Sequence, residues 1–335
     1  MSNSFKLILS KTPLRITFTG GGTDIPAYYR KYGPGAVVSA TINKYIYVII
    51  AKNFYSDEIR VSYSITENAI KNVEDIRHPT VRESLKLLDI KSGLQIISIT
   101  EIPSHGTGLG SSSSFLVGLL NALHAWKGEI VSPEELAKEA IKIEREILRE
   151  PGGKQDQYMA AYGGFRFIEF HSDETVLTIP TLPKMEDRKL LNDHLLLFYT
   201  GKERQSTSIH RDMEENIEDR LEYYNNLKKL AYKTHEYLSK GKWEEIGNLL
   251  DENWNFKKNI SKTISNDFID KIYEKAKKAG AIGGKIIGAG GGGFLLFFAP
   301  PEKHNEIRKE INLQEEPFRF EPFGSRISFM EEGYP

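Results

Sequence analysis

The first half of the chain alternates strand-like and helix-like patterns of hydrophobic and polar positions. Residues 44–53 (KYIYVIIAKN) and 94–102 (LQIISITEI) are rich in β-branched and aromatic side chains, which predicts two strands. Residues 111–126 directly follow a glycine-rich loop and predict a helix. A further helix is predicted to begin at Ser132, because SPEE supplies an N-cap serine, a proline at the first helical position and a glutamate three residues later. We expect it to run to about Arg149.

The composition changes at residues 178–191 (TIPTLPKMEDRKLL), which we interpret as the connection between two domains. Beyond it the pattern predicts a strand at 194–199, a long helical stretch at about 213–258 and a further helix at 267–279. A second glycine loop at 288–293 and a strand at 294–299 follow. This mixture predicts an α+β protein with two domains, an N-terminal one at 1–185 and a C-terminal one at 186–335.

Composition and charge narrow the classes of function. The 335 residues carry a net charge of −1 without a long block of one sign, which argues against nucleic acid as a partner. The absence of cysteine excludes disulfides and thiolate nucleophiles. The longest nearly apolar stretch, 286–300, is too short to span a bilayer, and the N-terminus has no signal-peptide pattern. We therefore expect a cytoplasmic protein without a membrane partner, as a monomer or homodimer.

The strongest chemical signal is residues 103–114 (PSHGTGLGSSSS), where a strand is followed by three spaced glycines and four serines that open a helix. Glycines allow a ligand to approach the backbone, and the N–H groups and dipole of a helix N-terminus favour phosphate. Serine hydroxyls can also bind Mg²⁺. A Walker A loop would need a lysine at the glycine–serine junction, and none is present. The alternative is an ordinary loop with a serine-rich N-cap.

Three other segments carry polar residues that have both a functional and an ordinary interpretation. Glu144 falls within the apolar stripe of its predicted helix, where a buried carboxylate needs a metal or a neighbouring cation. Asp156, between two glycine pairs in GGKQDQYMAAYGG, is either an N-cap or a carboxylate that takes a proton from a substrate hydroxyl. Arg15 and Asp24, in TPLRITFTGGGTD, are by themselves compatible with a solvent-facing charge and a turn.

Taken in order, these segments resemble the motifs of the GHMP kinase family, which includes galactokinase and mevalonate kinase, over nearly the whole chain. Residues 103–114 resemble its phosphate-binding loop, and 285–294 (KIIGAGGGGF) resemble its C-terminal glycine motif. The resemblance implies the GHMP kinase fold, with an N-terminal domain like ribosomal protein S5 domain 2 and a ferredoxin-like C-terminal domain. It also implies ATP and Mg²⁺ as cofactors.

The resemblance assigns roles to individual residues. Asp156 matches the catalytic aspartate, and Arg15 matches the arginine that contacts it. Ser112 and Glu144 would hold Mg²⁺. The expected nucleotide-binding residues are Pro103, Gly106, Gly108, Leu109, Gly110, Ser111, Ser112 and Ser113. The expected substrate-binding residues are Gly21, Gly22, Thr23, Asp24, Gly290 and Gly291.

The glycines at 20–22 bear on the substrate. They replace the Gly-Glu-His that follows the galactokinase arginine, which opens space and argues against galactose. The segments around Arg15 and Asp156 together resemble D-glycero-D-manno-heptose 7-phosphate kinases, which implies transfer of phosphate from ATP to the anomeric hydroxyl of a sugar phosphate, giving the 1,7-bisphosphate. Lys202 and Arg204 are candidates for the distal phosphate by position alone. The alternatives are another sugar or sugar-phosphate 1-kinase, a polyol or isoprenoid-pathway kinase, or a non-catalytic sensor of ATP and sugar.

Overall fold

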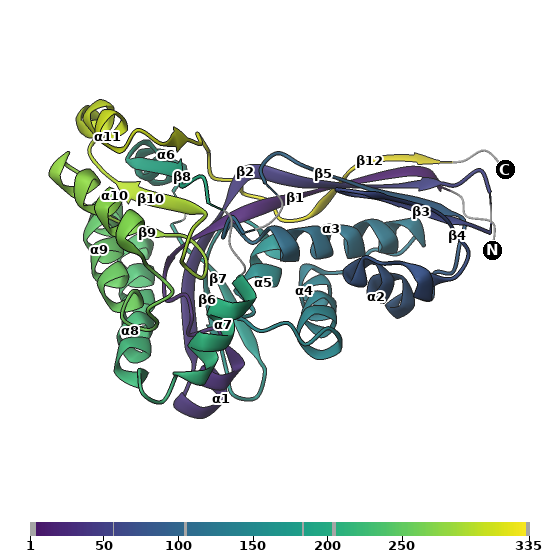
Figure 1. The fold of residues 1–335 in the computed structure, drawn as a ribbon, viewed down its shortest axis with the longest axis horizontal. Coiled ribbons are helices and arrows are strands. Elements are labelled where there is room, and N and C mark those ends of the chain that lie inside the picture. The colour runs from purple at the N-terminus through teal and green to yellow at the C-terminus, as the bar shows by residue number, and fades with distance from the viewer. Residues whose placement is uncertain (1–4, 56, 104–105, 183, 203–205, 333–335) are drawn as a thin grey trace.

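A computed structural model describes residues 5–55, 57–103, 106–182, 184–202 and 206–332. In Figure 1 a long, bent sheet crosses the molecule, helices cover one face of its extended arm, and a smaller sheet with its own helices lies at the opposite end from the chain termini. In the described residues the large sheet has eight strands in the order β12-β1-β2-β5-β3-β4, with β6 paired to β2 and β7 paired to β6. The small sheet has the order β11-β8-β10-β9.

The large sheet is organised by two long antiparallel strands, β1 (Phe5–Thr19) and β2 (Gly35–Lys52). The first part of β2 pairs with β6, whereas its second part pairs with β5. The first eight residues of β2 are all buried because helices cover this end of the sheet. The remaining strands are β3 (Ile59–Ser62), β4 (Thr66–Ile70), β5 (Leu94–Thr100), β6 (Phe165–Phe170), β7 (Val176–Pro180) and β12 (Arg326–Glu332).

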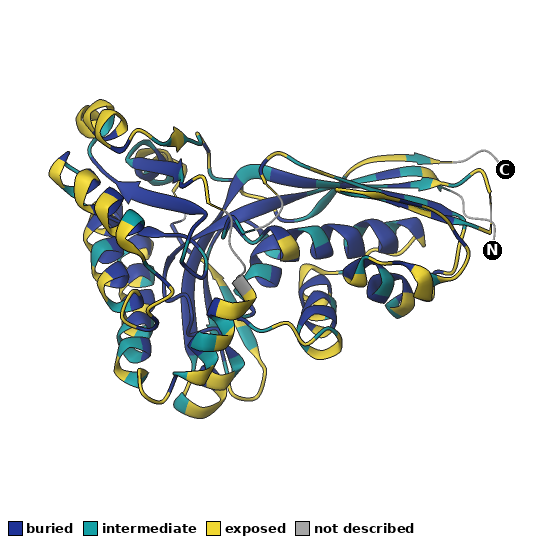
Figure 2. Cartoon of the chain, in the orientation of Figure 1, coloured by how far each residue is buried: buried dark blue, intermediate teal, exposed yellow. Residues whose placement is uncertain are grey.

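Helix α3 (Ser111–Trp126) is the central helix of this half and is buried over most of its length (Figure 2). It approaches β1 closely at Gly118, where an added Cβ would lie 2.5 Å from Oγ1 of Thr12. Ser10 Oγ also donates to the carbonyl of Gly118 at 2.8 Å. These contacts fix the helix against the strand that carries Arg15. The other helices here are α1 (Pro26–Tyr32), α2 (Pro79–Leu87), α4 (Pro133–Ile141) and α5 (Gln155–Tyr162), with a 3-10 turn at Val73–Asp75.

The C-terminal part combines the small sheet with a layer of helices. Its strands are β8 (Leu195–Tyr199), β9 (Gly283–Ile286), β10 (Phe294–Phe298) and β11 (Gln314–Glu315). Its helices are α6 (Met185–Asp193), α7 (Ser206–Glu215), α8 (Leu221–Ser239), α9 (Ile246–Lys257), α10 (Asp267–Lys278) and α11 (His304–Ile311), with 3-10 turns at Trp243–Glu245 and Pro301–Lys303.

The predicted α+β fold is confirmed, and several elements match closely. The 111–126 helix has the predicted bounds, and Ser132 forms the predicted capping box with Glu135. The segment 178–191, interpreted as the connection between the domains, contains the end of β7 and most of α6. The last strand, β12, returns to pair with β1 in the large sheet. The division into two domains at residue 185 stays a prediction. Among the described residues, no helix has both the length and the apolar character needed to cross a membrane.

Candidate active site

The glycine-rich loop is anchored to β1 by backbone and side-chain hydrogen bonds. The N–H of Arg15 donates to the carbonyl of Leu109 at 3.0 Å, and Ser114 Oγ donates to the carbonyl of Pro13 at 2.9 Å. Gly110 adopts the left-handed conformation, with φ +78°, as the N-cap of α3. The first turn of α3, with its N–H groups and positive dipole end, is therefore held beside the strand of Arg15.

Arg15 and Asp156 form a bidentate ion pair at the foot of α3. Arg15 Nε and Nη2 donate to the two carboxylate oxygens of Asp156, each at 2.7 Å. The third guanidinium nitrogen, Nη1, donates to the carbonyl of Gly108. Such a fork-like pair fixes the orientation of a carboxylate as well as its charge. A Cβ added to Gly110 would lie 3.3 Å from Asp156 Oδ2, so the loop, the arginine and the aspartate meet at one point.

Glu144 lies on the other side of the first turn of α3. It belongs to a π-helical turn (Lys142–Ile147) that continues α4, and only 2% of the residue is exposed. Its carboxylate accepts hydrogen bonds from Ser113 Oγ at 2.9 Å, from Ser112 Oγ at 3.2 Å and from Gln157 Nε2. Insertions of this kind in α-helices are frequent at functional sites. The predicted metal pair, Ser112 and Glu144, is therefore in contact.

A second buried carboxylate near Asp156 is that of Asp24, which lies in the turn after β1. Its oxygens accept hydrogen bonds from the backbone N–H of Gly22 at 3.0 Å and of Gln155 at 3.2 Å. The carboxylate lies directly over Gly153, where an added Cβ would be 1.8 Å from Oδ2. The glycine before α5 is thus required for Asp24 to occupy this position.

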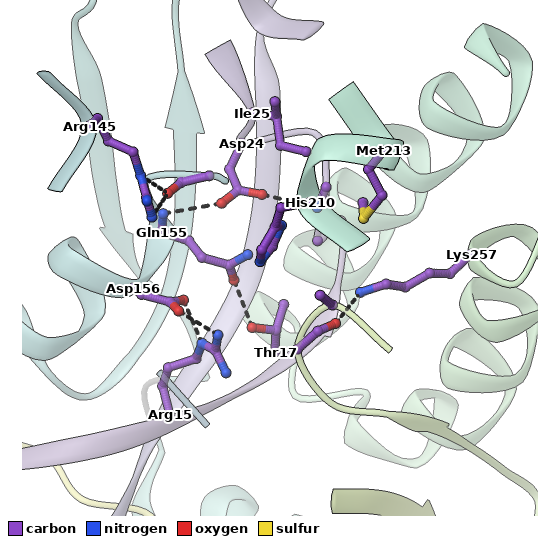
Figure 3. A pocket seen from close by; sticks show the side chains of 15 residues that line it. Arg15, Thr17, Asp24, Ile25, Arg145, Gln155, Asp156, His210, Met213 and Lys257 are labelled. Carbon is purple, nitrogen blue, oxygen red and sulfur yellow. Dashed lines mark hydrogen bonds and ion pairs between the residues drawn. The ribbon is translucent and has the colours of Figure 1, made fainter. Parts of the chain in front are cut away.

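Arg15, Asp156 and Asp24 line one cavity between the two halves of the chain, whereas Glu144 and Ser112 are not among its lining residues (Figure 3). In Figure 3, Arg15 and Asp156 lie at one side, Asp24 and Arg145 at another, and Lys257 reaches in from α9. The lining residues are Arg15, Thr17, Gly21, Gly22, Asp24, Ile25, Arg145, Gly153, Gln155, Asp156, His210, Met213, Lys257, Gly288 and Ala289. The cavity therefore combines two carboxylates with several cations, an arrangement suited to a polar and anionic small molecule.

The second glycine loop closes against the first one. A Cβ added at Gly293 would lie 2.3 Å from the carbonyl oxygen of Thr107, so only glycine permits this approach of the two loops. The backbone N–H of Gly293 donates to the carbonyl of Lys202, which holds the end of this loop beside β8.

Models of the GHMP kinase N-terminal and C-terminal domains match residues 68–164 and 234–315. A D-glycero-alpha-D-manno-heptose 7-phosphate kinase from Campylobacter jejuni is 33% identical over 92% of this chain and 94% of its own length. The chain belongs to the GHMP kinase family. It is therefore a kinase, and because kinases of this family use ATP, ATP is supported as its phosphate donor.

Solved structures of GHMP kinases agree with this assignment. A D-glycero-D-manno-heptose 1-phosphate kinase from Bacteroides thetaiotaomicron superposes with a TM-score of 0.80 and 27% identity, over 98% of this chain and 100% of that one. A Lactococcus lactis galactokinase in complex with galactose superposes with a TM-score of 0.71 at 18% identity, covering 96% and 95% of the two chains, and shows the shared fold alone. Together with the relative from Campylobacter jejuni, the first structure supports a sugar-phosphate kinase.

The GHMP kinase fold brings most of the predicted site residues together, but some of them contact other parts of the protein rather than face the cavity. Thr23 Oγ1 lies 2.9 Å from the carbonyl oxygens of both Gly20 and Ala36, and its hydroxyl, shared between them, stabilises the turn after β1. Leu109 is fully buried and its carbonyl accepts the N–H of Arg15, so the structure gives this residue an anchoring contact with β1. Pro103 is exposed at the start of the loop, and residues 104 and 105 lie outside the described residues.

The predicted glycines of the second loop lie beside the cavity rather than among its lining residues. Gly291 N–H donates to the carbonyl of Ile264, and an added Cβ at Gly290 would meet the same residue. Gly288 and Ala289 line the cavity instead. Lys202 is exposed, with its ammonium 4.7 Å from the ring centroid of Phe268, and is not among the residues that line the cavity. Arg204 lies outside the described residues.

Several lining residues of this GHMP kinase were not predicted, and Lys257 and Gln155 are the most informative. Lys257 follows Leu250, Asn253 and Trp254 on the buried stripe of α9, so the rule that singled out Glu144 could have found it. Gln155 directly precedes Asp156, and its amide gives no pattern of its own. The other unpredicted side chains in the lining are Thr17, Ile25, Arg145, His210, Met213 and Ala289.

Proposed function

We propose that this kinase transfers the γ-phosphoryl group of ATP to the anomeric C1 hydroxyl of D-glycero-D-manno-heptose 7-phosphate, giving the 1,7-bisphosphate. The observation that carries the proposal is the 33% identity to a heptose 7-phosphate kinase, which extends over nearly the full length of both chains. The cavity supports it, because carboxylates for hydroxyl groups and cations for a phosphate line the same space.

In this proposal the nucleotide phosphates lie along the loop at Gly106–Gly110 and the first turn of α3. Backbone N–H groups and the helix dipole at that turn stabilise negative charge without any movement during the reaction. Phosphoryl transfer depends mainly on in-line positioning and on neutralising the charge of the transferred group, which suits such a site. Ser111 Oγ, 3.2 Å from Thr107 Oγ1, belongs to the same polar turn.

Asp156 is proposed to accept the proton of the sugar O1 hydroxyl as the oxygen attacks the γ-phosphorus. Arg15 holds the carboxylate in one orientation through its two 2.7 Å hydrogen bonds, so the accepting oxygens keep a fixed direction. Asp24, already fixed by two backbone N–H groups, accepts hydrogen bonds from ring hydroxyls and positions the sugar.

Glu144 and the first turn of α3, which contact each other, fit a Mg²⁺ ion. Mg²⁺ prefers oxygen ligands and is usually bound by one or two carboxylates together with substrate phosphates. Glu144 offers a buried carboxylate whose hydrogen-bond donors are the neutral groups of Ser112, Ser113 and Gln157. Glu144 and the Ser112 hydroxyl would hold the ion, which would neutralise phosphate charge when bound.

A coupled ADP-release assay with Mg-ATP tests the proposal against a panel of sugars and sugar phosphates. Strong turnover of heptose 7-phosphate, with little turnover of galactose or mannose, is the expected result. Phosphorus and proton NMR of the product should place the new phosphate on C1. Turnover of a different sugar would contradict the heptose assignment while retaining the kinase mechanism.

Heptose 1-phosphate belongs in the same panel as a second candidate acceptor. The specific observation that favours it is the name of the Bacteroides thetaiotaomicron structure, a heptose 1-phosphate kinase with 27% identity to this chain. Preference for that acceptor would contradict transfer to C1, because C1 already carries a phosphate in it. ATP binding without turnover of any sugar would instead favour a sensor.

A further inference from the structure

One corner of the cavity, in front of Gly21, is bordered by hydrogen-bond donors. A Cβ added at Gly21 would lie 3.7 Å from Gln155 Nε2, 3.7 Å from Lys257 Nζ and 3.5 Å from Thr17 Cγ2. We call the space between Gly21, Gln155 and Lys257 the donor corner. All three residues line the cavity, and Figure 3 shows Gln155 and Lys257 directed into it from opposite sides.

The Gln155 amide is oriented by the strands beneath it. Its oxygen Oε1 accepts hydrogen bonds from Thr17 Oγ1 at 2.7 Å and from Ser39 Oγ at 3.2 Å. The Ser39 hydroxyl is also 3.0 Å from Thr17 Oγ1, so β1 and β2 together fix this amide. The NH₂ group, which can only donate, is consequently turned toward the donor corner.

Lys257 brings a positive charge to the other side of the corner. The residue is 4% exposed, and its ammonium donates to the carbonyl of Gly288 at 2.6 Å. Close to it lies Lys285, 1% exposed, with Nζ 3.2 Å from the carbonyl oxygen of Phe18. Burial lowers the pKa of Lys285 well below its usual value, and repulsion from Lys257 and Arg15 lowers it further. Lys285 therefore adds little positive charge, and Lys257 is the cation that favours an anion at this corner.

We propose that the donor corner binds the phosphate group that the sugar substrate already carries. This inference rests on the proposed function, since it assumes a phosphorylated sugar as the acceptor. Asp24 and Asp156 would repel a phosphate and suit hydroxyl groups, whereas the donor corner offers an amide and an ammonium to phosphate oxygens. The missing side chain at Gly21 keeps the space between these two donors free of a Cβ.

The phosphoryl group transferred from ATP has the same chemistry and is the other possible source of an anion at this corner. The two sources predict different kinetics. Loss of a contact with the substrate's own phosphate weakens binding of phosphorylated sugars only, whereas loss of a contact with the transferred group slows every acceptor alike.

The test is to measure kcat/KM of Lys257→Met for heptose 7-phosphate and for unphosphorylated heptose at saturating Mg-ATP. We expect the preference for the phosphorylated sugar to fall about tenfold or more, mainly through a higher KM, because a hydrogen bond to a charged group is lost. Lys258→Met is the matched control: it removes the same charge from the next residue, which is exposed, and should keep the preference. An unchanged preference with an equal loss on both sugars would overturn the proposal and assign the corner to the transferred phosphoryl group.

A second variant, Gly21→Ala, tests the proposal even if Lys257→Met does not fold. Gly21 does not have a positive φ, and an added Cβ would make only ordinary contacts, so Gly21→Ala should fold. Its methyl group would occupy the donor corner and should raise KM for heptose 7-phosphate more than KM for heptose. An equal effect on both sugars would count against the proposal.

Binding of inorganic phosphate separates this inference from the proposed function. With the nucleotide loop filled by AMP-PNP, calorimetry should detect phosphate binding to the wild-type protein and binding at least about tenfold weaker to Lys257→Met. If phosphate binds in this way but no heptose phosphate is turned over, the proposed substrate is wrong and the donor corner stands. If the wild-type protein does not bind phosphate, the donor corner is overturned whatever the sugar.

Discussion

Two carboxylates flank the first turn of α3, and they differ in what holds them. Asp156 accepts two charged hydrogen bonds from Arg15, and 23% of its side chain is exposed toward the cavity. Glu144, whose side chain is only 2% exposed, accepts its hydrogen bonds from hydroxyl and amide groups. The nearest Arg145 nitrogen is 4.0 Å away, and the guanidinium donates to the carbonyls of Gly153, Glu150 and Pro151.

This difference suggests two different tasks for the same functional group. A carboxylate whose charge is balanced by a fixed arginine is oriented as a proton acceptor and gains little from a further cation. A buried carboxylate whose hydrogen bonds come from neutral donors, with an arginine nitrogen 4.0 Å away, keeps negative charge that is only weakly compensated and that a bound cation would stabilise. The comparison therefore assigns Asp156 to proton transfer and Glu144 to metal binding, and substitutions at each position can break it.

The largest expected effect is that of Asp156→Asn. The amide keeps the size of the side chain but cannot accept the proton, so kcat should fall by about 10²–10⁴-fold while the protein remains folded. Steady-state kinetics with the preferred sugar, together with a circular dichroism melt, measures both quantities. A variant with more than about a tenth of the wild-type rate would remove Asp156 from the role of base.

Glu144→Gln should act on the metal rather than on the proton. We expect the Mg²⁺ concentration for half-maximal activity to rise by about tenfold or more, since even outer-shell partners of a metal contribute 10–100-fold to its affinity. Glu146→Gln, at an exposed position of the same helical turn, is the matched control and should leave the Mg²⁺ titration unchanged. An unchanged titration of Glu144→Gln combined with a lower Tm would show that the carboxylate has a structural role.

Local patterns in the sequence predicted much of the fold and, of the two carboxylates compared above, the burial of Glu144. The bounds of α3 and the capping box at Ser132 follow from neighbouring residues, because helix periodicity and capping are local. The burial of Glu144 follows from its position on an apolar stripe. Contact of Asp156 with Arg15 came from the family resemblance, since residues so far apart in the chain meet only through the packing of α5 on β1.

The unpredicted part of the site depends on packing between distant elements. Gln155 acquires a direction only because Thr17 and Ser39, on neighbouring strands, hold its oxygen. Lys257 reaches the cavity because α9 packs against β1 and β9. Lys202, chosen for its place after β8, is instead exposed beside Phe268. Position along the chain does not determine which way a side chain on a turn points.

A smaller effect is expected for a substitution at Gly110, where the first glycine-rich loop contacts Asp156. Gly110→Ala places a Cβ at a φ of +78° and 3.3 Å from Asp156 Oδ2, so it should lower both stability and kcat. The left-handed backbone alone costs roughly 1–2 kcal/mol for a residue with a side chain. Gly128→Ala has the same φ of +78° with its nearest neighbour 4.0 Å away, and should show the stability loss without the catalytic loss. Equal kcat values for the two variants would contradict contact with the catalytic carboxylate.

The smallest expected effect concerns a third kind of carboxylate contact, at the other end of α3. His124 Nδ1 and Nε2 lie 2.8 Å from carboxylate oxygens of Glu129 and Glu139, and Glu139 belongs to α4, the helix that continues into the turn of Glu144. Both ring nitrogens can donate only in the doubly protonated imidazolium. Burial opposes that charge, but the hydrogen bonds with Glu139 and Glu129 outweigh it and raise the pKa of His124 above its usual value.

A raised folded-state pKa fixes the sign of the pH dependence. The imidazolium contributes its full stability below the unfolded-state pKa of about 6.5, and this contribution is lost as the pH rises through the folded-state pKa. The difference in unfolding free energy between the wild-type protein and His124→Gln, from urea titrations between about pH 6 and 9, should therefore shrink with rising pH. A difference that is constant over this range would contradict the charged contact. His124 lies at the end of α3 away from Ser112, so the Mg²⁺ titration of His124→Gln should match that of the wild type. This result would separate the contact between α3 and α4 from metal binding at Glu144.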